Sequence, residues 1–423
     1  MPEAVSQPTG QSLFVMVGEK SADRHAAPAM AMLKRLRPEL KIWGAGGSAM
    51  EAAGVELLRN CEEFAVIGIV EVWARLLRFY KLRNQILEAI AQRKPDVILL
   101  IDMGAFNLQL SKDLRKRFPK LPILYFISPQ VWASREWRIN TLARTVTKML
   151  VIFPFEEKVY LQRGVPAKFV GHPLLTTMPD STKLKSRQEF CADVGLNPDH
   201  PIIGIFAGSR QGEVRTFGDT LMQAVQELHE QYPSMQFVFS AGDPRLEKIL
   251  NGCMKKAKLE FLLGKELHIL DSTHNWHLMN ACDLLWAKSG TTTLEAALVG
   301  KPMICFYGGM WLSYFLFMGF KRIKRVAWPN VLAGELLVPE LFQLDCRAEQ
   351  LVRYTRDLLD VPALRQEMSQ KLLRLQAQLG QGDYASNVAN EVISILDGSG
   401  VSGSTSVSSP PGSAGVSPAP TAE

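Results

Sequence analysis

Short, continuous apolar runs recur along this chain, and segments long enough for a helix separate each run from the next. A run that is apolar at every position, rather than at alternate positions, predicts a strand buried on both faces of its sheet. Strands of this kind that alternate with helices predict parallel, doubly wound sheets. The runs are Leu13–Val17, Lys41–Trp43, Val97–Ile101, Ile123–Ile127 and Met149–Ile152 in the first half, and Ile202–Phe206, Phe237–Ser240, Leu267–Leu270, Leu284–Ala287 and Met303–Phe306 in the second.

Because the pattern occurs twice, the 423-residue chain is predicted to form two α/β domains of ordinary size. A turn-rich stretch over 171–181 separates the halves and is predicted to link them. Two such domains form a cleft at the carboxyl ends of their strands, where open α/β sheets bind ligands. The predicted division is 12–175, 200–365, a helical segment 366–397 that could pack back on the first domain, and a disordered Gly-, Ser- and Pro-rich tail 398–423.

The composition is that of a globular protein, with 47% hydrophobic and 21% charged residues, and no apolar run is long enough to span a membrane. The six cysteines are scattered without a CxxC pair, and the polar first twelve residues do not resemble a signal peptide. We therefore expect free thiols in a reducing compartment. An isolated HxxH, His274 to His277, has no third ligand at a sensible spacing, so no metal is predicted.

Basic residues gather between 75 and 148, where 15 Lys and Arg stand against 5 Asp and Glu, a local net charge of +10. Such a face could meet anionic lipid, nucleic acid or a phosphorylated substrate, or could simply be solvated. Two segments, 64–80 and 311–328, mix aromatic and aliphatic residues with Arg or Lys. They suit a surface that lies on a bilayer or receives an acyl chain, and equally suit core helices with basic ends.

Carboxylates and hydroxyls follow two predicted strands of the first half. The first strand leads into Glu19, Ser21 and Asp23 ahead of a helix, which makes a polar pocket at the carboxyl end of the strand. Ser21 or Asp23 could also serve only as a helix cap. Asp102 ends a very hydrophobic strand, so its carboxylate could have a raised pKa suited to a general base, or could bond loop amides.

A third polar block, Ser128-Pro-Gln-Val-Trp-Ala-Ser-Arg135, follows another buried strand. In it, Gln130, Trp132 and Arg135 offer an amide, a ring and a cation. This set suits a sugar or a phosphate, because aromatic faces stack on sugar rings and Arg pairs with phosphate.

The second half has a glycine at a strand–helix junction in Gly208-Ser-Arg-Gln-Gly-Glu213. The glycine lets the backbone come near a ligand, and the amides of the following helix offer a seat for a diphosphate. Arg210 could neutralise a leaving diphosphate. The block is not a P-loop, because the Gly-Lys-Ser/Thr ending is absent.

The block Lys288-Ser-Gly-Thr-Thr-Thr-Leu-Glu295 follows a strand and opens a helix. Its hydroxyls and amides could hold phosphates, and Glu295 could accept both ribose hydroxyls. Ser289 or Thr291 as an ordinary N-cap accounts for one hydroxyl, but not for the whole set.

Taken in chain order, these blocks resemble the lipid-A-disaccharide synthase family, whose GT-B fold has two doubly wound, Rossmann-like domains facing across a cleft. The resemblance runs from 18 to about 343, and Ser128-Pro-Gln-Val-Trp132 and Phe169-Val-Gly-His-Pro-Leu174 are its most specific parts. The other resembling blocks are Gly18-Glu-x-Ser-x-Asp23, Asp102-x-x-x-Phe-Asn107, Pro154-Phe-Glu156, Gly208-Ser-Arg-x-x-Glu213, Ser289-Gly-Thr-x-Thr-Leu-Glu295, Lys301-Pro-Met303, Pro329-Asn330 and Val338-Pro-Glu-x-x-Gln343.

The resemblance implies an inverting transfer of diacylglucosamine from UDP-2,3-diacylglucosamine to the 6-hydroxyl of 2,3-diacylglucosamine 1-phosphate, which gives a β-1,6 disaccharide and UDP. The first domain would face the acceptor and the membrane, and the second would bind the UDP-sugar. Without a DxD motif, neither metal nor cofactor is implied. The implied roles are Asp102 or Glu19 as base; Gly208, Ser209, Arg210, Glu213, Ser289, Gly290, Thr291, Thr293, Glu295 and Asn330 for the nucleotide; and Ser21, Asp23, Ser128, Gln130, Trp132 and Arg135 for the acceptor.

The same resemblance implies a peripheral protein on the cytoplasmic face of the inner membrane, with no nucleic-acid partner and with a homodimer as one possible assembly. Two positions depart from the family pattern: Ala22 stands where a second glycine is usual, and Ala105 where a second aspartate is frequent. Two alternatives stay open. One is a noncatalytic, membrane-docking sugar-nucleotide binder, which Ala105 favours, and the other is a different UDP-sugar enzyme of GT-B fold.

Overall fold

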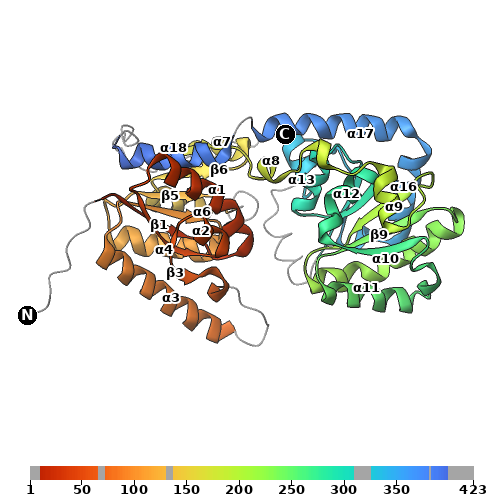
Figure 1. Ribbon diagram of the computed structural model, residues 1–423, viewed down its shortest axis with the longest axis horizontal. Helices are drawn as coiled ribbons and strands as arrows, with labels where there is room; N and C mark the ends of the chain where they lie inside the picture. Colours follow the sequence, from red (N-terminus) through yellow and green to blue (C-terminus); the bar gives the residue numbers. More distant parts are fainter. Residues whose placement is uncertain (1–9, 65–71, 130–136, 309–324, 381–382, 399–423) are drawn as a thin grey trace, which may run out of the picture.

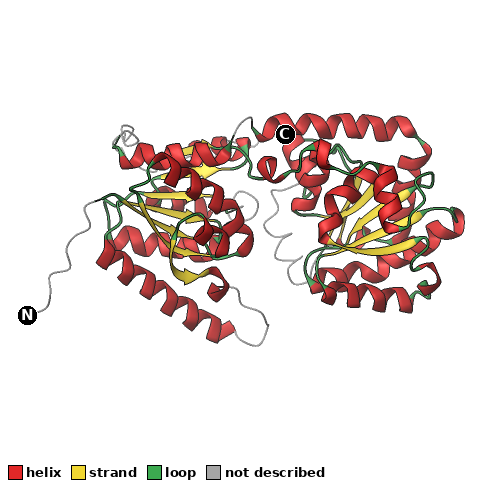
Figure 2. Ribbon diagram, in the orientation of Figure 1, coloured by secondary structure: helices red, strands yellow, loops and turns green. Residues whose placement is uncertain are grey.

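The computed structural model describes residues 10–64, 72–129, 137–308, 325–380 and 383–398, which form two lobes (Figure 1). Each lobe is a parallel sheet with helices on both faces (Figure 2). The strand order is β3-β2-β1-β4-β5-β6-β7 in the first lobe and β10-β9-β8-β11-β12-β13 in the second. The two doubly wound, Rossmann-like domains predicted from the repeated apolar runs are therefore confirmed.

The elements of the first lobe come from both ends of the chain. The strands are β1 Ser12–Met16, β2 Lys41–Gly46, β3 Glu56–Asn60, β4 Val97–Ile101, β5 Ile123–Phe126, β6 Lys148–Val151 and β7 Ala167–Phe169, and the helices are α1 Lys20–Leu36, α2 Ser48–Ala52, α3 Val72–Arg93, α4 Gly104–Arg117, α6 Trp137–Thr145, α7 Pro154–Leu161 and α18 Tyr384–Leu396.

The second lobe begins after a short connecting helix, α8 Leu174–Thr177. Its strands are β8 Ile202–Phe206, β9 Gln236–Ala241, β10 Leu267–Asp271, β11 Leu284–Lys288, β12 Met303–Tyr307 and β13 Glu340–Phe342, and its helices are α9 Arg187–Val194, α10 Gln211–Gln231, α11 Pro244–Lys256, α12 Asn275–Ala281, α13 Thr291–Leu298, α15 Trp328–Ala333, α16 Ala348–Asp360 and α17 Pro362–Leu375.

The central strands are buried on both faces, because apolar side chains occupy almost all of their positions. Every residue of β1, β4 and β8 is buried. The apolar runs did not predict β3, β7 and β13. All three lie at an edge of their sheet, where a strand can be short and partly exposed, so that it needs no continuous apolar run.

Each sheet has one point where the strand order reverses. In the first lobe the chain adds β2 and β3 on one side of β1 and then places β4 on the other side. In the second lobe the same reversal separates β8 from β11. Ligands of open α/β sheets bind outside the carboxyl ends of the strands at such a reversal. The loops after β1, β4, β8 and β11 are therefore the expected site loops.

The chain crosses between the lobes twice, and α17 and α18 lie on different lobes (Figure 1). Leu372 and Leu375 of α17 belong to the core of the second lobe. Helix α18 packs against α1 of the first lobe through residues such as Val388 and Val392. Where the two crossings meet, the His172 amide donates a hydrogen bond to the Leu379 carbonyl over 3.1 Å.

A cluster of apolar side chains from both lobes fills the junction, and we call it the interdomain seam. The first lobe contributes Phe153, and α13 of the second lobe contributes Leu294 and Leu298. Leu174 and Leu379, one from each crossing, are buried in the same cluster. Helix α13, which begins within the Ser289 block, is thus packed directly against the domain junction.

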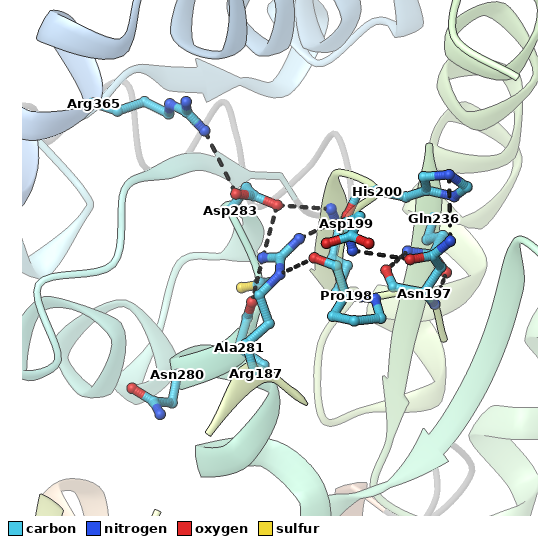
Figure 3. A network of polar contacts seen from close by, with 12 residues as sticks. Arg187, Asn197, Pro198, Asp199, His200, Gln236, Asn280, Ala281, Asp283 and Arg365 are labelled. Carbon is cyan, nitrogen blue, oxygen red and sulfur yellow. Dashed lines mark hydrogen bonds and ion pairs between the residues drawn. The ribbon is translucent and has the colours of Figure 1, made fainter. Parts of the chain in front are cut away.

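The amino ends of the second sheet are held by a polar network around Arg187 and Asp283 (Figure 3). Arg187 donates to the carbonyls of Pro198, His200 and Ala281 and pairs with the Asp283 carboxylate at 3.0 Å. Asp283 also accepts a hydrogen bond from the Ile202 amide, at the start of β8. The network joins α9 to the sheet at the end opposite to the site loops, which gives those loops a fixed base.

Candidate active site

The loops after β1 and β4 meet at the reversal point of the first sheet. A Cβ built on Gly18 would lie 2.1 Å from the Met103 sulfur, so the loops leave no room for a side chain there unless Met103 moves. Asp102 and Met103 have φ values of 51° and 52°. This left-handed conformation costs about 1–3 kcal/mol in a non-glycine residue, and strain of this kind clusters at functional sites.

Buried polar groups hold the strained turn in place. The Asp102 amide donates to the Phe126 carbonyl over 3.0 Å. The Asp102 carbonyl accepts hydrogen bonds from Asn107 Nδ2 at 2.8 Å and from the Tyr125 hydroxyl at 2.7 Å. The Asn107 of the Asp-x-x-x-Phe-Asn block therefore acts on the main chain of Asp102 and fixes the backbone from which its carboxylate projects.

The two carboxylates predicted as candidate bases lie within electrostatic reach of each other. Burial raises the pKa of Asp102, the negative charge of Glu19 raises it further, and a hydrogen bond from the Met103 amide lowers it in part. Glu19 is exposed at the position before α1. A partly buried carboxyl with a raised pKa at the end of a strand has the properties that a general base requires.

Asp23, one of the predicted acceptor residues, holds the neighbouring loop. Its side chain is only 4% exposed, and its carboxylate accepts hydrogen bonds from the amides of Gly47, Ala49 and Met50 at 2.7, 3.0 and 3.3 Å. These amides open α2, so Asp23 stabilises the start of that helix. Ser21 is exposed in the first turn of α1.

The Ser-Pro-Gln-Val-Trp block is described only at its beginning. Ser128 is buried, and its hydroxyl lies 2.5 Å from that of Tyr160. It therefore fixes the turn after β5, and its contact with the acceptor stays a prediction. Gln130, Trp132 and Arg135, the other predicted acceptor residues of the block, lie outside the described residues.

A pocket opens at the reversal point of the second sheet, between the amino ends of α10 and α13. Helix amino ends favour anions, because their amides lack partners within the helix. The residues lining it are Phe206, Gly208, Ser209, Glu213, Ser240, Gly242, Ser272, Asn275, Lys288, Ser289, Gly290, Thr291 and Thr292. We call it the nucleotide pocket, after the prediction for Gly208 and Ser289.

Glu213 orders one wall of this pocket. Its Oε2 accepts hydrogen bonds from the amides of Ser209 and Arg210 at 3.0 and 3.2 Å, and its Oε1 accepts one from Lys288 Nζ at 2.7 Å. Burial alone would raise the pKa of Glu213, but Lys288 and the two amides together lower it. Gly208, with φ 124°, leaves space for this carboxylate, since a Cβ there would lie 2.6 Å from Oε2.

The Ser289 block forms the opposite wall with only part of its hydroxyls. Ser289, Gly290 and Thr291 line the pocket, and the Ser289 hydroxyl donates to the Val326 carbonyl over 2.7 Å. Thr293 is fully buried, and its hydroxyl donates to the Gly290 carbonyl at 2.8 Å. Thr293 thus stabilises the first turn of α13, and its role toward the nucleotide stays a prediction.

Asn330 and Glu295, two of the predicted nucleotide residues, are not among the residues that line the pocket. Asn330 is fully buried, donates to the Val338 carbonyl and to Glu340, and accepts from the amides of Leu337 and Val338. Its side-chain amide is thus bonded to other parts of the protein, and its role toward the nucleotide stays a prediction. Glu295 lies on α13, and burial raises its pKa.

Seven of the residues that line the nucleotide pocket were not among the predicted site residues, and Lys288, Ser240 and Asn275 are three of them. Lys288 ends β11 and Ser240 lies at the end of β9, both at the carboxyl edge where a strand-end rule could have found them. Asn275, which begins α12, approaches Ser240 with 2.6 Å between Oδ1 and the hydroxyl. Its position depends on the packing of α12, which no sequence pattern reveals.

The first lobe has a pocket of its own next to the candidate bases. It is lined by Lys20 and Arg24 from α1, by the start of α2, and by Asn60 and Cys61. Asp23 also borders it, but this carboxylate is engaged by the three backbone amides. The two cations, Lys20 and Arg24, make the pocket suitable for an anionic group.

Sequence comparison places this chain in a known family. A family model described as lipid-A-disaccharide synthetase matches residues 13–392. The chain belongs to the lipid-A-disaccharide synthase family. The lipid-A-disaccharide synthase of Geobacter sulfurreducens is 35% identical over 392 residues, which cover 93% of this chain and 99% of that protein. Lipid-A-disaccharide synthase 1 of Legionella pneumophila is 34% identical over 391 residues, or 92% and 98%.

Solved structures share the fold of this lipid-A-disaccharide synthase family member at low identity. UDP-GlcNAc 2-epimerase from Neisseria meningitidis, bound to UDP-GlcNAc, has a TM-score of 0.61 at 12% identity and covers 92% of this chain and 100% of its own. MurG of Acinetobacter baumannii has a TM-score of 0.51 at 15% identity and covers 90% and 98%. These likenesses confirm the GT-B fold, and the family match identifies the chain as a glycosyltransferase rather than an epimerase. Among the helices that the structure describes, none has the length and apolar character to span a bilayer.

Proposed function

We propose that this chain joins UDP-2,3-diacylglucosamine to 2,3-diacylglucosamine 1-phosphate, with inversion, to give the β-1,6 lipid A disaccharide 1-phosphate and UDP. The observation that carries the proposal is the division of the chemistry between the two reversal points. The first sheet presents Asp102 and Glu19, which suit proton abstraction, and the second presents an anion-binding pocket between two helix amino ends. A two-substrate transfer needs both.

On the acceptor side, Asp102 accepts the proton of the sugar 6-hydroxyl as that oxygen attacks the anomeric carbon. The new bond forms on the face opposite to the diphosphate, and the electron pair of the broken C–O bond leaves with UDP, so the anomeric centre inverts. A positioned base contributes roughly 10²–10⁴-fold to such a step. Burial and the neighbouring charge of Glu19 raise the pKa of Asp102, which makes its carboxylate a stronger base than an ordinary aspartate.

On the donor side, the amides at the start of α13 and the loop at Ser209 receive the diphosphate. Arg210, whose side chain is 83% exposed, can fold onto the bound diphosphate from the rim of the pocket. Charge that develops on the leaving UDP is stabilised by these oriented donors. Glu295 is proposed to accept the ribose hydroxyls, and Asn330 to hold the Ser289 wall by fixing Glu340, which accepts from the amides of Val326 and Ala327.

The pocket beside the candidate bases suits the 1-phosphate of the acceptor. Lys20 directly follows Glu19, and Arg24 lies one turn further along α1. An acceptor sugar whose 6-hydroxyl reaches the carboxylates can therefore direct its 1-phosphate to these cations, which bind phosphate well.

Both proposed substrates carry acyl chains, so the enzyme must act at a membrane surface, and we propose the cytoplasmic face of the inner membrane. The first lobe exposes the aromatic side chains of Tyr80 on α3 and Trp137 at the start of α6, and it exposes the basic side chains of Lys116 and Arg117 in the last turn of α4. Basic residues near anionic lipid contribute about 1 kcal/mol each. Reduced cosedimentation of Lys116→Gln/Arg117→Gln with phosphatidylglycerol vesicles would support this surface.

The reaction is tested by turnover of the two proposed substrates in detergent micelles, with Asp102→Asn compared to the wild type. We expect disaccharide and UDP from the wild type, and a rate at least 100-fold lower from the variant. Activity that survives in Asp102→Asn but not in Glu19→Gln would move the base to Glu19. Bound UDP without any product from the wild type would favour the noncatalytic alternative, in which Ala105 marks a lost function.

A further inference from the structure

The nucleotide pocket contains a cation that the sequence analysis did not assign. Among the described residues that line it, Lys288 is the one with a positively charged side chain. Arg210, the arginine of the neighbouring motif, does not line the pocket, and its side chain is 83% exposed. A diphosphate seated between the two helix amino ends therefore meets Lys288 before it meets Arg210.

Backbone pairing and two side-chain contacts hold Lys288 at the pocket wall. It is the last residue of β11, pairs in register with Phe306 of β12, and has a side chain that is only 17% exposed. Its ammonium lies 2.7 Å from Glu213 Oε1 and 5.4 Å from the centre of the Tyr307 ring. The strand end, the carboxylate and the ring together keep the ammonium at the pocket wall.

We propose that Lys288 binds the diphosphate of the UDP-sugar, and that Glu213 holds its ammonium in position while the pocket is empty. This inference rests on the proposed function, because it assigns a residue to the diphosphate of that donor. It adds a cation fixed inside the pocket to the one that Arg210 supplies from the rim.

The hydrogen bonds of Glu213 allow Lys288 to move to the diphosphate while the loop at Ser209 and Arg210 stays ordered. The carboxylate uses Oε2 for the amides of Ser209 and Arg210, and uses Oε1 for Lys288. The ammonium can therefore turn toward a phosphate oxygen while Oε2 keeps the loop ordered. Because an ammonium has three N–H donors, it can also bind Oε1 and a phosphate oxygen together.

The alternative is that Lys288 only neutralises Glu213 and touches no ligand. The two roles predict different effects of removing the lysine. If Lys288 contacts the diphosphate, the loss of binding affinity should grow with the number of phosphates on the ligand. Titration calorimetry with uridine, UMP and UDP measures this on the full-length protein, for the wild type, Lys288→Met and Lys288→Arg. Lys248→Met, on the exposed side of α11, is the matched control for loss of a lysine.

We expect Lys288→Met to weaken UDP binding roughly 10- to 100-fold, the usual worth of a charge-assisted hydrogen bond, to weaken UMP binding less, and to leave uridine binding unchanged. Lys288→Arg should recover most of the affinity for UDP, and Lys248→Met should match the wild type. Equal losses for all three ligands, or no loss for UDP, would overturn the assignment.

A double-mutant cycle separates direct from indirect action, since it measures what Lys288 does once its partner is gone. If Lys288 contacts the diphosphate, Lys288→Met should still weaken UDP binding in a Glu213→Gln background. If it acts only through Glu213, the second substitution should have no further effect. A wild-type protein that does not bind UDP would instead refute the proposed function, so the two failures are distinguishable.

Discussion

The indole of Trp328 stacks on the ring of Phe153, with the ring centres 4.3 Å apart and an interplanar angle of 20°. Phe153 follows β6 in the first domain, and Trp328 begins α15 in the second. The ring of His172, at the first chain crossing, lies 4.9 Å from that of Phe153. Leu294 of α13 is part of the same seam. The seam therefore packs α13, which borders the nucleotide pocket, against the domain that carries the candidate bases.

Phe153→Ala should lower the free energy of unfolding by about 3–5 kcal/mol, because it removes a buried ring and the stacking contact with Trp328. It should also raise KM for the donor, because α13 loses its support at the junction. Urea unfolding and steady-state kinetics measure the two effects. Leu336→Ala, at a leucine that is 68% exposed, is the control. A loss of stability no larger than in that control would refute the structural role of the seam.

The charge of Glu19 should be visible in the pH dependence of catalysis. A base must be ionised, so activity rises with pH through the pKa of Asp102, which burial and the Glu19 charge both raise. Glu19→Gln removes the second contribution, lowers the pKa of Asp102, and should move the acid limb of the kcat/KM profile to lower pH. An acid limb that stays in place, or shifts upward, would separate Asp102 from the proton transfer.

Asp102→Asn should bind UDP normally and be at least as stable as the wild type at neutral pH. The pKa of Asp102 is raised in the folded state, so the ionised carboxylate opposes folding at every pH above its unfolded value. Asparagine carries no charge, so it removes that cost to stability and at the same time removes the base. Thermal unfolding together with turnover distinguishes this from a general loss of structure, which would lower the melting temperature and the activity together.

Asp23→Ala should destabilise the first domain by about 2 kcal/mol, because three amides at the start of α2 lose their acceptor. Asp23→Asn keeps one carbonyl oxygen and should lose less. Denaturant unfolding of both, with the exposed Ser21→Ala as control, checks the order. If Asp23→Ala is as stable as the control but has a raised KM for the acceptor, the original prediction of an acceptor contact is right.

The sequence predicted the fold well because the central strands are buried on both faces, and this leaves a direct mark in their composition. Val97–Ile101 is apolar throughout, and it forms a fully buried strand. The edge strand Glu56–Asn60 has no such mark, because its neighbours bury only part of it. Strand-end polarity also indicated the loops of the candidate site, since strand ends and reversal points follow from the order of the elements.

The direction of individual side chains could not be predicted in the same way. Asn330, Thr293 and Asp23 carry groups that could bind a ligand or a backbone, and a motif has the same letters in both cases. Their hydrogen bonds depend on loops that come from other parts of the chain: Asn330 binds the 337–338 backbone, and Asp23 binds the start of α2. Lys288 was missed for a related reason: its proposed role depends on Glu213, a partner that only the fold brings next to it.

The buried His172 at the domain crossing should make folding sensitive to mild acid. Its Nδ1 accepts a hydrogen bond from the Leu174 amide, and burial, aided by the nearby His25, lowers its pKa to about 3. The unfolded chain, with a pKa near 6.5, then binds one more proton than the folded chain between these values. Stability is complete above pH 6.5 and should fall by up to about 1.4 kcal/mol per pH unit as the pH decreases toward 3.

His172→Asn isolates this contribution, because the asparagine oxygen can replace Nδ1 as the acceptor for the Leu174 amide but does not titrate. We expect the variant to be less stable than the wild type at pH 7, where it loses packing against Phe153, and to lose less stability on going from pH 6.5 to pH 4.5. Other groups titrate in both proteins, so the difference between the two pH profiles belongs to His172 and to its coupling with His25. Parallel profiles would mean that His172 becomes protonated in the folded state as readily as in the unfolded chain, and that the crossing admits the charge.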